Sequence, residues 1–110
     1  MPKYLTFFSY TSTAAKAMIE RPTDRTAAVK ALVESIGGKL ESFYWMSGDH
    51  DGFIIASYPD TTTAAALSVA VASTGAVQGL QTFELFDHDA QARIVKAAKA
   101  AAKAYKAPTA

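Results

Sequence analysis

The segment from Tyr4 to Tyr10 carries large side chains on both of its faces, and this feature constrains the fold more than any other. As a β-strand it divides its residues into two alternating sets, with Leu5, Phe7 and Ser9 opposite Tyr4, Thr6, Phe8 and Tyr10. A strand that is apolar on both faces must be covered on both faces. The sheet that contains this strand therefore needs a covering layer on each side.

Turn residues and apolar spacing divide the rest of the chain into further strands and helices. A helix is expected to begin near Ala14, to be interrupted at Pro22 and to restart behind a cap at Thr23 or Asp24. Its apolar stripe is Val29, Leu32, Val33 and Ile36, and Gly37-Gly38 ends it. A hairpin over 37–55, a helix over 60–73, a strand over 77–86 and a helix over 89–105 follow.

The order β-α-β-β-α-β predicts a ferredoxin-like α+β fold with a C-terminal helix. Residues 1–87 are expected to form the domain, and residues 88–110 an Ala/Lys-rich helix and tail. The alternation of the last strand predicts that Val77, Gln81, Phe83 and Leu85 share one face. The C-terminal helix is expected to dock through Ile94, Ala98, Ala101 and Tyr105, and to keep its lysines in solvent.

A single copy of this sheet has helices on one face only, and its other face would be bare. An apolar patch of that size is rare on soluble monomers and usually marks an interface. Two such sheets packed face to face would bury both patches, as in a dimeric α/β barrel. We therefore expect a homodimer or a higher homo-oligomer.

The charge balance excludes several classes of partner. Eleven basic and ten acidic residues give a net charge of +1, which argues against bulk nucleic acid and against an anionic membrane surface. The chain has no cysteine, so disulfides, thiolate metal sites and thiol nucleophiles are excluded. No apolar run is long enough to cross a bilayer, and the N-terminus lacks the pattern of a signal peptide. The expected location is the cytoplasm.

The turn of the hairpin holds the densest group of ionisable residues next to aromatic ones, Asp49-His50-Asp51. A histidine flanked by carboxylates can act in acid/base chemistry or bind a metal. The alternative is ordinary turn chemistry, because Asp side chains accept hydrogen bonds from nearby backbone amides. A metal site would need His50 and His88 to converge, which their spacing does not indicate, so no metal is predicted.

Polar-tipped residues on the strands are the remaining candidates, namely Tyr10, Tyr44, Trp45, Tyr58 and Glu84. They can be interface residues, with an apolar ring that is buried and a polar group in solvent. Alternatively, they can line a cavity beneath the helices and orient a small ligand there. The ligand-binding candidates are thus His50, Asp51, Asp49, Tyr44, Tyr10 and Glu84. No nucleotide loop or nucleophile elbow is present, and no cofactor is indicated.

Several stretches resemble one family. Gly48-Asp49-His50-Asp51 is similar to the motif that names the GYD-domain family, although His50 stands where tyrosine is usual. The blocks 1–11, 28–44 and 60–77 resemble that family's strands and helices. Departures occur at Gln78, Gly79 and Gln81, where Arg and Thr are usual. The resemblance implies a dimeric α/β barrel and no particular activity.

Two classes of function remain open at this point. The first is a small-molecule protein that binds or transforms a ligand in the cavity between sheet and helices, with His50 and Asp51 at its rim. The second is a non-catalytic protein that assembles with copies of itself. A deep pocket that converges on His50, together with a shifted histidine pKa, would favour the first class. A filled core with extensive further interfaces would favour the second.

Overall fold

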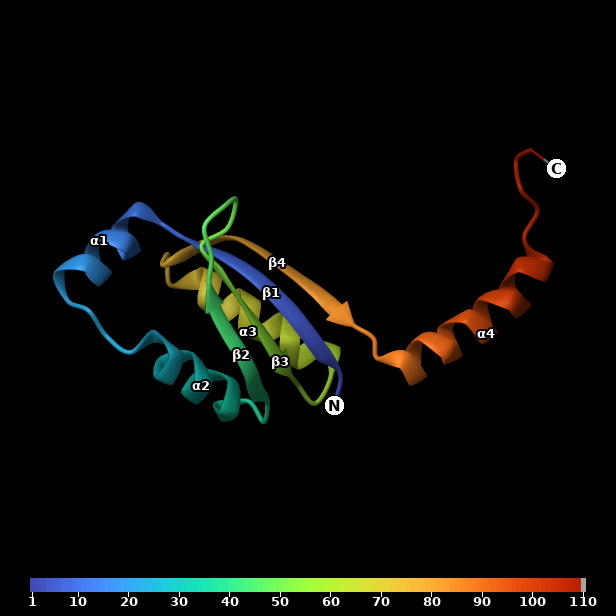
Figure 1. The fold of residues 1–110 in the computed structure, drawn as a ribbon, viewed down its shortest axis with the longest axis horizontal. Coiled ribbons are helices and arrows are strands. Elements are labelled where there is room, and N and C mark those ends of the chain that lie inside the picture. Colours follow the sequence, from blue (N-terminus) through green and yellow to red (C-terminus); the bar gives the residue numbers. More distant parts are fainter. Residues whose placement is uncertain (110) are drawn as a thin grey trace.

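The computed structural model describes residues 1–109, which form an antiparallel sheet with helices against one face (Figure 1). The elements in chain order are β1 (Lys3–Tyr10), α1 (Ser12–Glu20), α2 (Arg25–Ser35), β2 (Lys39–Trp45), β3 (Gly52–Ser57), α3 (Thr61–Ser73), β4 (Val77–Leu85) and α4 (His88–Ala104). The predicted ferredoxin-like order is confirmed. The break between α1 and α2 falls at Pro22, as expected.

Side-chain caps begin all four of these helices. Asp24, Asp60 and Asp87 accept hydrogen bonds from the amides three residues ahead, at 3.0, 2.8 and 2.8 Å, and Thr11 caps α1 in the same way at 3.3 Å. A capping oxygen pairs an amide that the first helical turn leaves free. The helix starts are therefore encoded locally, by single residues.

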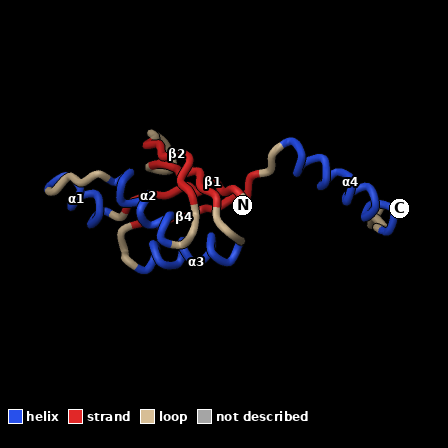
Figure 2. The backbone as a smooth tube through the Cα atoms, turned by 90° about the horizontal axis from the view of Figure 1, so that it is seen from below, coloured by secondary structure: helices blue, strands red, loops and turns tan. Residues whose placement is uncertain are grey.

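The strands lie in the order β2-β3-β1-β4, and every neighbouring pair is antiparallel. Tyr4 stands opposite Ala56 on β3 and Glu84 on β4, which places these residues on the same face. Helices α2 and α3 lie on that side of the sheet, and α1 lies beyond the ends of the strands (Figure 2). We call it the helix face and its opposite the helix-free face.

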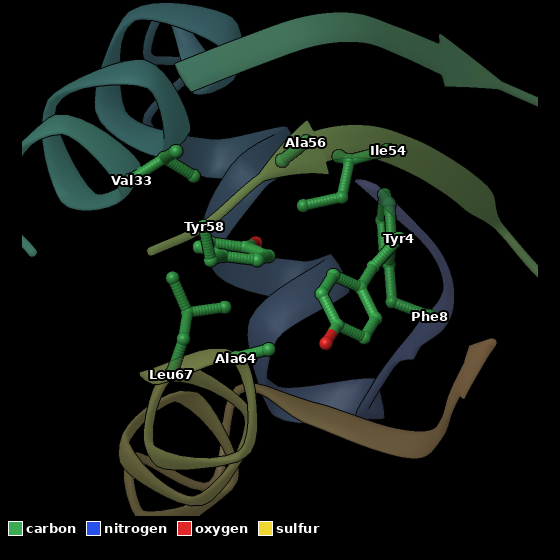
Figure 3. Close-up of a cluster of buried hydrophobic side chains, with 8 residues drawn as sticks. All are labelled: Tyr4, Phe8, Val33, Ile54, Ala56, Tyr58, Ala64 and Leu67. Atoms are coloured by element: carbon green, nitrogen blue, oxygen red, sulfur yellow. The ribbon is translucent and has the colours of Figure 1, made fainter. Parts of the chain in front are cut away.

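The hydrophobic core lies between the helix face and helices α2 and α3. Its buried members are Tyr4, Phe8, Val33, Ile54, Ala56, Tyr58, Ala64 and Leu67 (Figure 3). Val33 on α2 and Leu67 on α3 point toward Tyr58, which connects the two helices to the sheet. One set of alternating residues in β1 is thus buried by this chain alone.

A bulge in β4 changes which residues face the helices. Phe7 pairs with Gln81, but Ser9 pairs with Gln78, so β4 contains one extra residue between these positions. Gly79 adopts a φ of 62°, which glycine tolerates better than other residues. Val77 therefore lies on the helix face with Leu80, and the prediction that it shares a face with Gln81 and Phe83 is wrong.

The helix-free face carries a continuous apolar surface. The register places on it Leu5, Phe7, Tyr44, Phe53, Ile55, Phe83 and Leu85. Phe83 is 51% exposed and Tyr44 is 60% exposed. No element of the described chain covers this face.

The C-terminal helix extends away from the domain, and the prediction that it docks is wrong (Figures 1 and 2). None of its residues is buried, and Ile94 and Val95 are 45% and 54% exposed. Helices α2 and α3 already cover the helix face, and the Ala/Lys-rich sequence forms a helix without a tertiary partner. As a result the described molecule measures 60 × 32 × 23 Å.

Candidate functional site

A cavity of about 200 Å³ lies between the helix face and helices α2 and α3. Its walls are almost entirely apolar and include Phe8, Leu80, Val29, Leu32, Leu67 and Val71. Several of these residues also belong to the core or pack against it. Two residues with small side chains, Ala28 and Ala76, belong to its lining and leave space beside the core.

Tyr10 and Arg25 form the polar end of this cavity. Burial raises the pKa of the Tyr10 hydroxyl, and the neighbouring Arg25 guanidinium opposes this shift by favouring the phenolate. Asp51 adds a smaller effect that also raises this pKa. Tyr10 therefore stays protonated at neutral pH and can donate a hydrogen bond.

Arg25 was not among the residues predicted to form a site. Its Nε is buried and has no hydrogen-bond partner among the described residues. The sequence did hold a signal, because Arg25, Val29 and Leu32 are spaced by four and three residues and thus share one side of α2. That signal shows a cation on the apolar stripe, but it does not show that a cavity lies below.

Asp51 has a structural role in the turn. Its carboxylate accepts a hydrogen bond from the Tyr10 amide at 2.7 Å, and its own amide donates to the Phe8 carbonyl at 2.9 Å. These bonds tie the β2–β3 turn to the end of β1. The bond of the Asp51 side chain is thus a long-range contact to β1, and not the local hydrogen bond within the turn that the sequence offered as an alternative.

His50 lies on the opposite side of the sheet from the cavity, so its expected position at the cavity rim is wrong. Its ring stacks on Phe7 with centroids 5.0 Å apart and an interplanar angle of 24°, and its Nδ1 is buried without a partner in residues 1–109. The physical reason is strand alternation, since Phe7 projects from the helix-free face. Asp49 is exposed in the turn.

Tyr44 and Glu84 do not join the cavity either. Tyr44 stacks on Phe53 on the helix-free face, with centroids 5.5 Å apart. Glu84 is on the helix face, opposite the core residue Tyr4, but it is exposed because β4 is an edge strand. Of the six predicted residues, only Tyr10 lines the cavity.

The described residues hold no group of three or more His, Asp or Glu side chains arranged to bind a metal ion. In the same part of the chain, none of the helices has both the length and the apolar character needed to span a bilayer. The cavity, with its hydroxyl and its guanidinium, is thus the clearest place for a ligand.

Comparison with known proteins supports the fold. The structure is similar to the crystal structure of MtbAldR, with a TM-score of 0.53 and 16% sequence identity over 79% of this chain. This chain spans only 53% of that protein's length, and the similarity concerns the fold alone. No curated protein matches the sequence. The family model described as the GYD domain matches residues 4–95. Since this match covers most of the chain, the protein belongs to the GYD domain family.

Proposed function

We propose that this protein is a homodimer that binds a small apolar molecule in the cavity between its sheet and its helices. The observation that carries the proposal is the cavity itself, about 200 Å³ in volume and lined by aliphatic and aromatic side chains. The cavity is open to solvent beside Ala28 and Thr74, which are exposed, so a ligand can enter it. An apolar cavity of roughly 150 Å³ in another protein stays dry and binds benzene.

The dimer accounts for the helix-free face. Burial of apolar surface contributes about 25 cal/mol per Å², so the exposed side chains of Phe83, Tyr44 and their neighbours favour association. At one end of the face Lys3 and Glu41 form an ion pair at 3.0 Å, which supplies a polar rim. Association through this face leaves the cavity, on the opposite side of the sheet, free to bind.

The test is a methyl NMR titration of the full chain with benzene, because benzene has no polar group and reports on the apolar walls alone. We expect the methyl signals of Val29, Leu32 and Leu67 to shift. Val71→Phe should abolish the shifts by filling the cavity, since Val71 lines it. Val69→Phe is the matched control, because Val69 is on the same helix and is 70% exposed.

Two results would reject binding in the cavity. One is the absence of methyl shifts in the wild-type protein at saturating benzene. The other is a response of Val71→Phe equal to that of Val69→Phe, which would place the benzene elsewhere.

A second function, self-assembly without a ligand, is favoured by a different observation. Helix α4 extends from the domain with Ile94 and Val95 exposed, so it offers apolar surface to another copy. Native mass spectrometry of protein purified from its host separates the two functions. A retained small molecule on a dimer supports ligand binding, whereas larger species without added mass support assembly.

A further inference from the structure

We infer that the ligand is a small apolar acid, whose carboxylate binds at Arg25 and Arg21 while its apolar body fills the cavity. This inference rests on the proposed function and names the chemical class of the ligand. It begins from a second hollow in the surface, between α1 and the start of α2. The two hollows share Tyr10, Arg25 and Ala76 in their linings, so they are neighbours on either side of these residues.

The second hollow is cationic. Its polar lining residues are Arg21, Arg25, Thr23 and Tyr10, the rest of its lining is apolar, and it includes no acidic residue. Within residues 1–109, neither arginine forms an ion pair with a carboxylate. A molecule that extends from the cavity into this hollow would therefore pass from aliphatic walls to two guanidinium groups.

Arg25 is the residue that points to an anion. A buried donor that lacks a partner costs free energy, and the Nε of Arg25 is such a donor. The planar guanidinium matches a carboxylate, which can accept two parallel hydrogen bonds from it. The Tyr10 hydroxyl, which keeps its proton at neutral pH, supplies a further donor at the same place.

The nearby carboxylates of the protein are already engaged. Asp24 accepts the Ala27 amide at 3.0 Å, and Asp51 accepts the Tyr10 amide at 2.7 Å. Each of these carboxylates holds a backbone amide, and neither lies within ion-pair distance of Arg25 in residues 1–109. An anion from solution is thus the partner that fits.

The size of the cavity limits the apolar part of the ligand. Pockets for drug-sized molecules measure roughly 300–1,000 Å³, and this one is smaller, at about 200 Å³. At roughly 30 Å³ for a water-sized group, the volume suits an apolar body of about six to eight carbon atoms. Octanoate is therefore a suitable probe.

The experiment measures the affinity of the full chain for octanoate, 1-octanol and octylamine at pH 7, by calorimetry and by methyl NMR. The three probes have the same tail and differ in the charge of the head group. We expect octanoate to bind about tenfold more tightly than 1-octanol, which corresponds to one charge-assisted hydrogen bond, and octylamine to bind most weakly. Arg25→Gln should lower the affinity for octanoate far more than the affinity for 1-octanol, so that the preference for octanoate is lost.

Two further variants complete the design. Arg21→Gln should reduce the preference, and Lys16→Gln is the control, because Lys16 is an exposed cation on α1 that lines neither hollow. If Arg25→Gln no longer binds 1-octanol, the substitution has disturbed the fold of the cavity. The preference for octanoate over 1-octanol is then measured in the variants Arg21→Gln and Tyr10→Phe. In that case a preference unchanged by both variants overturns the inference.

The outcomes separate this inference from the proposed function. Equal affinity for octanoate and 1-octanol, with shifts at the cavity methyls, overturns the acid and leaves the cavity function standing. A preference for octanoate that survives Arg25→Gln and Arg21→Gln also overturns it. Failure of all three probes and of benzene to shift those methyls overturns both proposals.

Discussion

At the scale of single residues, Asp51 shows how a group that looks catalytic in the sequence can serve the backbone. Its carboxylate pairs the Tyr10 amide, while His50 beside it turns to the other face and stacks on Phe7. The three ionisable side chains of the turn do not converge on one point. Their closeness in the sequence reflects the tight turn that they occupy.

Substitution of Asp51 should reveal this backbone role. Asp51→Ala removes the acceptor of the Tyr10 amide and should lower the free energy of unfolding by about 1 kcal/mol. Asp51→Asn keeps an acceptor oxygen and should have a much smaller effect. Urea unfolding of both variants, with the exposed Asp49→Ala as control, measures the difference. Equal losses in Asp51→Ala and Asp49→Ala would contradict the role.

Tyr58 is a second residue with a measurable consequence. Its ring is 1% exposed, its hydroxyl has no hydrogen-bond partner in the described residues, and burial raises the pKa of this hydroxyl. The folded protein therefore holds the phenol proton more tightly than the unfolded chain. This contribution to stability is complete below the unfolded pKa of about 10 and is lost as pH rises through the folded pKa.

Tyr58→Phe should therefore be neutral or stabilising by about 1 kcal/mol at pH 7, because it removes an unpaired buried hydroxyl. It should also lessen the loss of stability above pH 10, of which Tyr10 would still cause a part. Urea unfolding at neutral and alkaline pH measures both effects, with Tyr44→Phe as the exposed control. A clear destabilisation of Tyr58→Phe at pH 7 would mean that the hydroxyl has a partner.

At the scale of elements, α4 is an independent unit. Asp87 caps it, Asp89 and Lys103 complement its dipole, and none of its residues is buried. Because no residue of α4 is buried, we expect the domain to fold without this helix. The family model likewise ends at residue 95, within this helix.

Deletion of residues 89–110 should thus leave the urea midpoint of the domain nearly unchanged. If α4 contacts other copies, the same deletion should lower the mass of the assembly, which light scattering detects. A domain that unfolds at clearly lower urea concentration, at an unchanged assembly size, would show that α4 docks on the sheet or its helices. The control is Lys99→Gln, which removes one positive charge from the exposed surface of α4 and should leave both the urea midpoint and the assembly mass unchanged.

At the scale of the whole molecule, the sheet is covered by helices on one face only. Helices α2 and α3 cover one face, and the other presents aromatic and aliphatic side chains to solvent. The proposed homodimer would cover this face with a second copy. The ligand cavity and the proposed interface then use opposite sides of one sheet, and each can be altered separately.

Phe83→Lys should convert the dimer into a monomer, because it places a charge on the helix-free face, where Phe83 is 51% exposed. Val69→Lys makes the same change on the outer side of α3 and should leave the dimer intact. Light scattering checks both, against a monomer mass of 11.7 kDa. A wild-type monomer at high concentration, or a dimer unaffected by Phe83→Lys, would reject this interface.

The sequence by itself determined the order of the elements, their caps and the two-faced character of β1. These properties depend on neighbours a few residues apart, such as Asp24 with Ala27 or the alternation along residues 4–10. The sequence alone was also enough to recognise the GYD domain family. For the same reason the interruption at Pro22 and the end of α2 near Gly37 could be predicted.

The tertiary structure alone decided the site. The cavity lies between elements that are distant in sequence, with Ala28 and Ala76 in its lining, and no local pattern encodes such a space. The bulge places Val77 on the helix face, and the turn places His50 on the helix-free face, against Phe7. Arg25 and Tyr10 meet only because α2 packs over the end of β1, which is a property of packing and not of spacing along the chain.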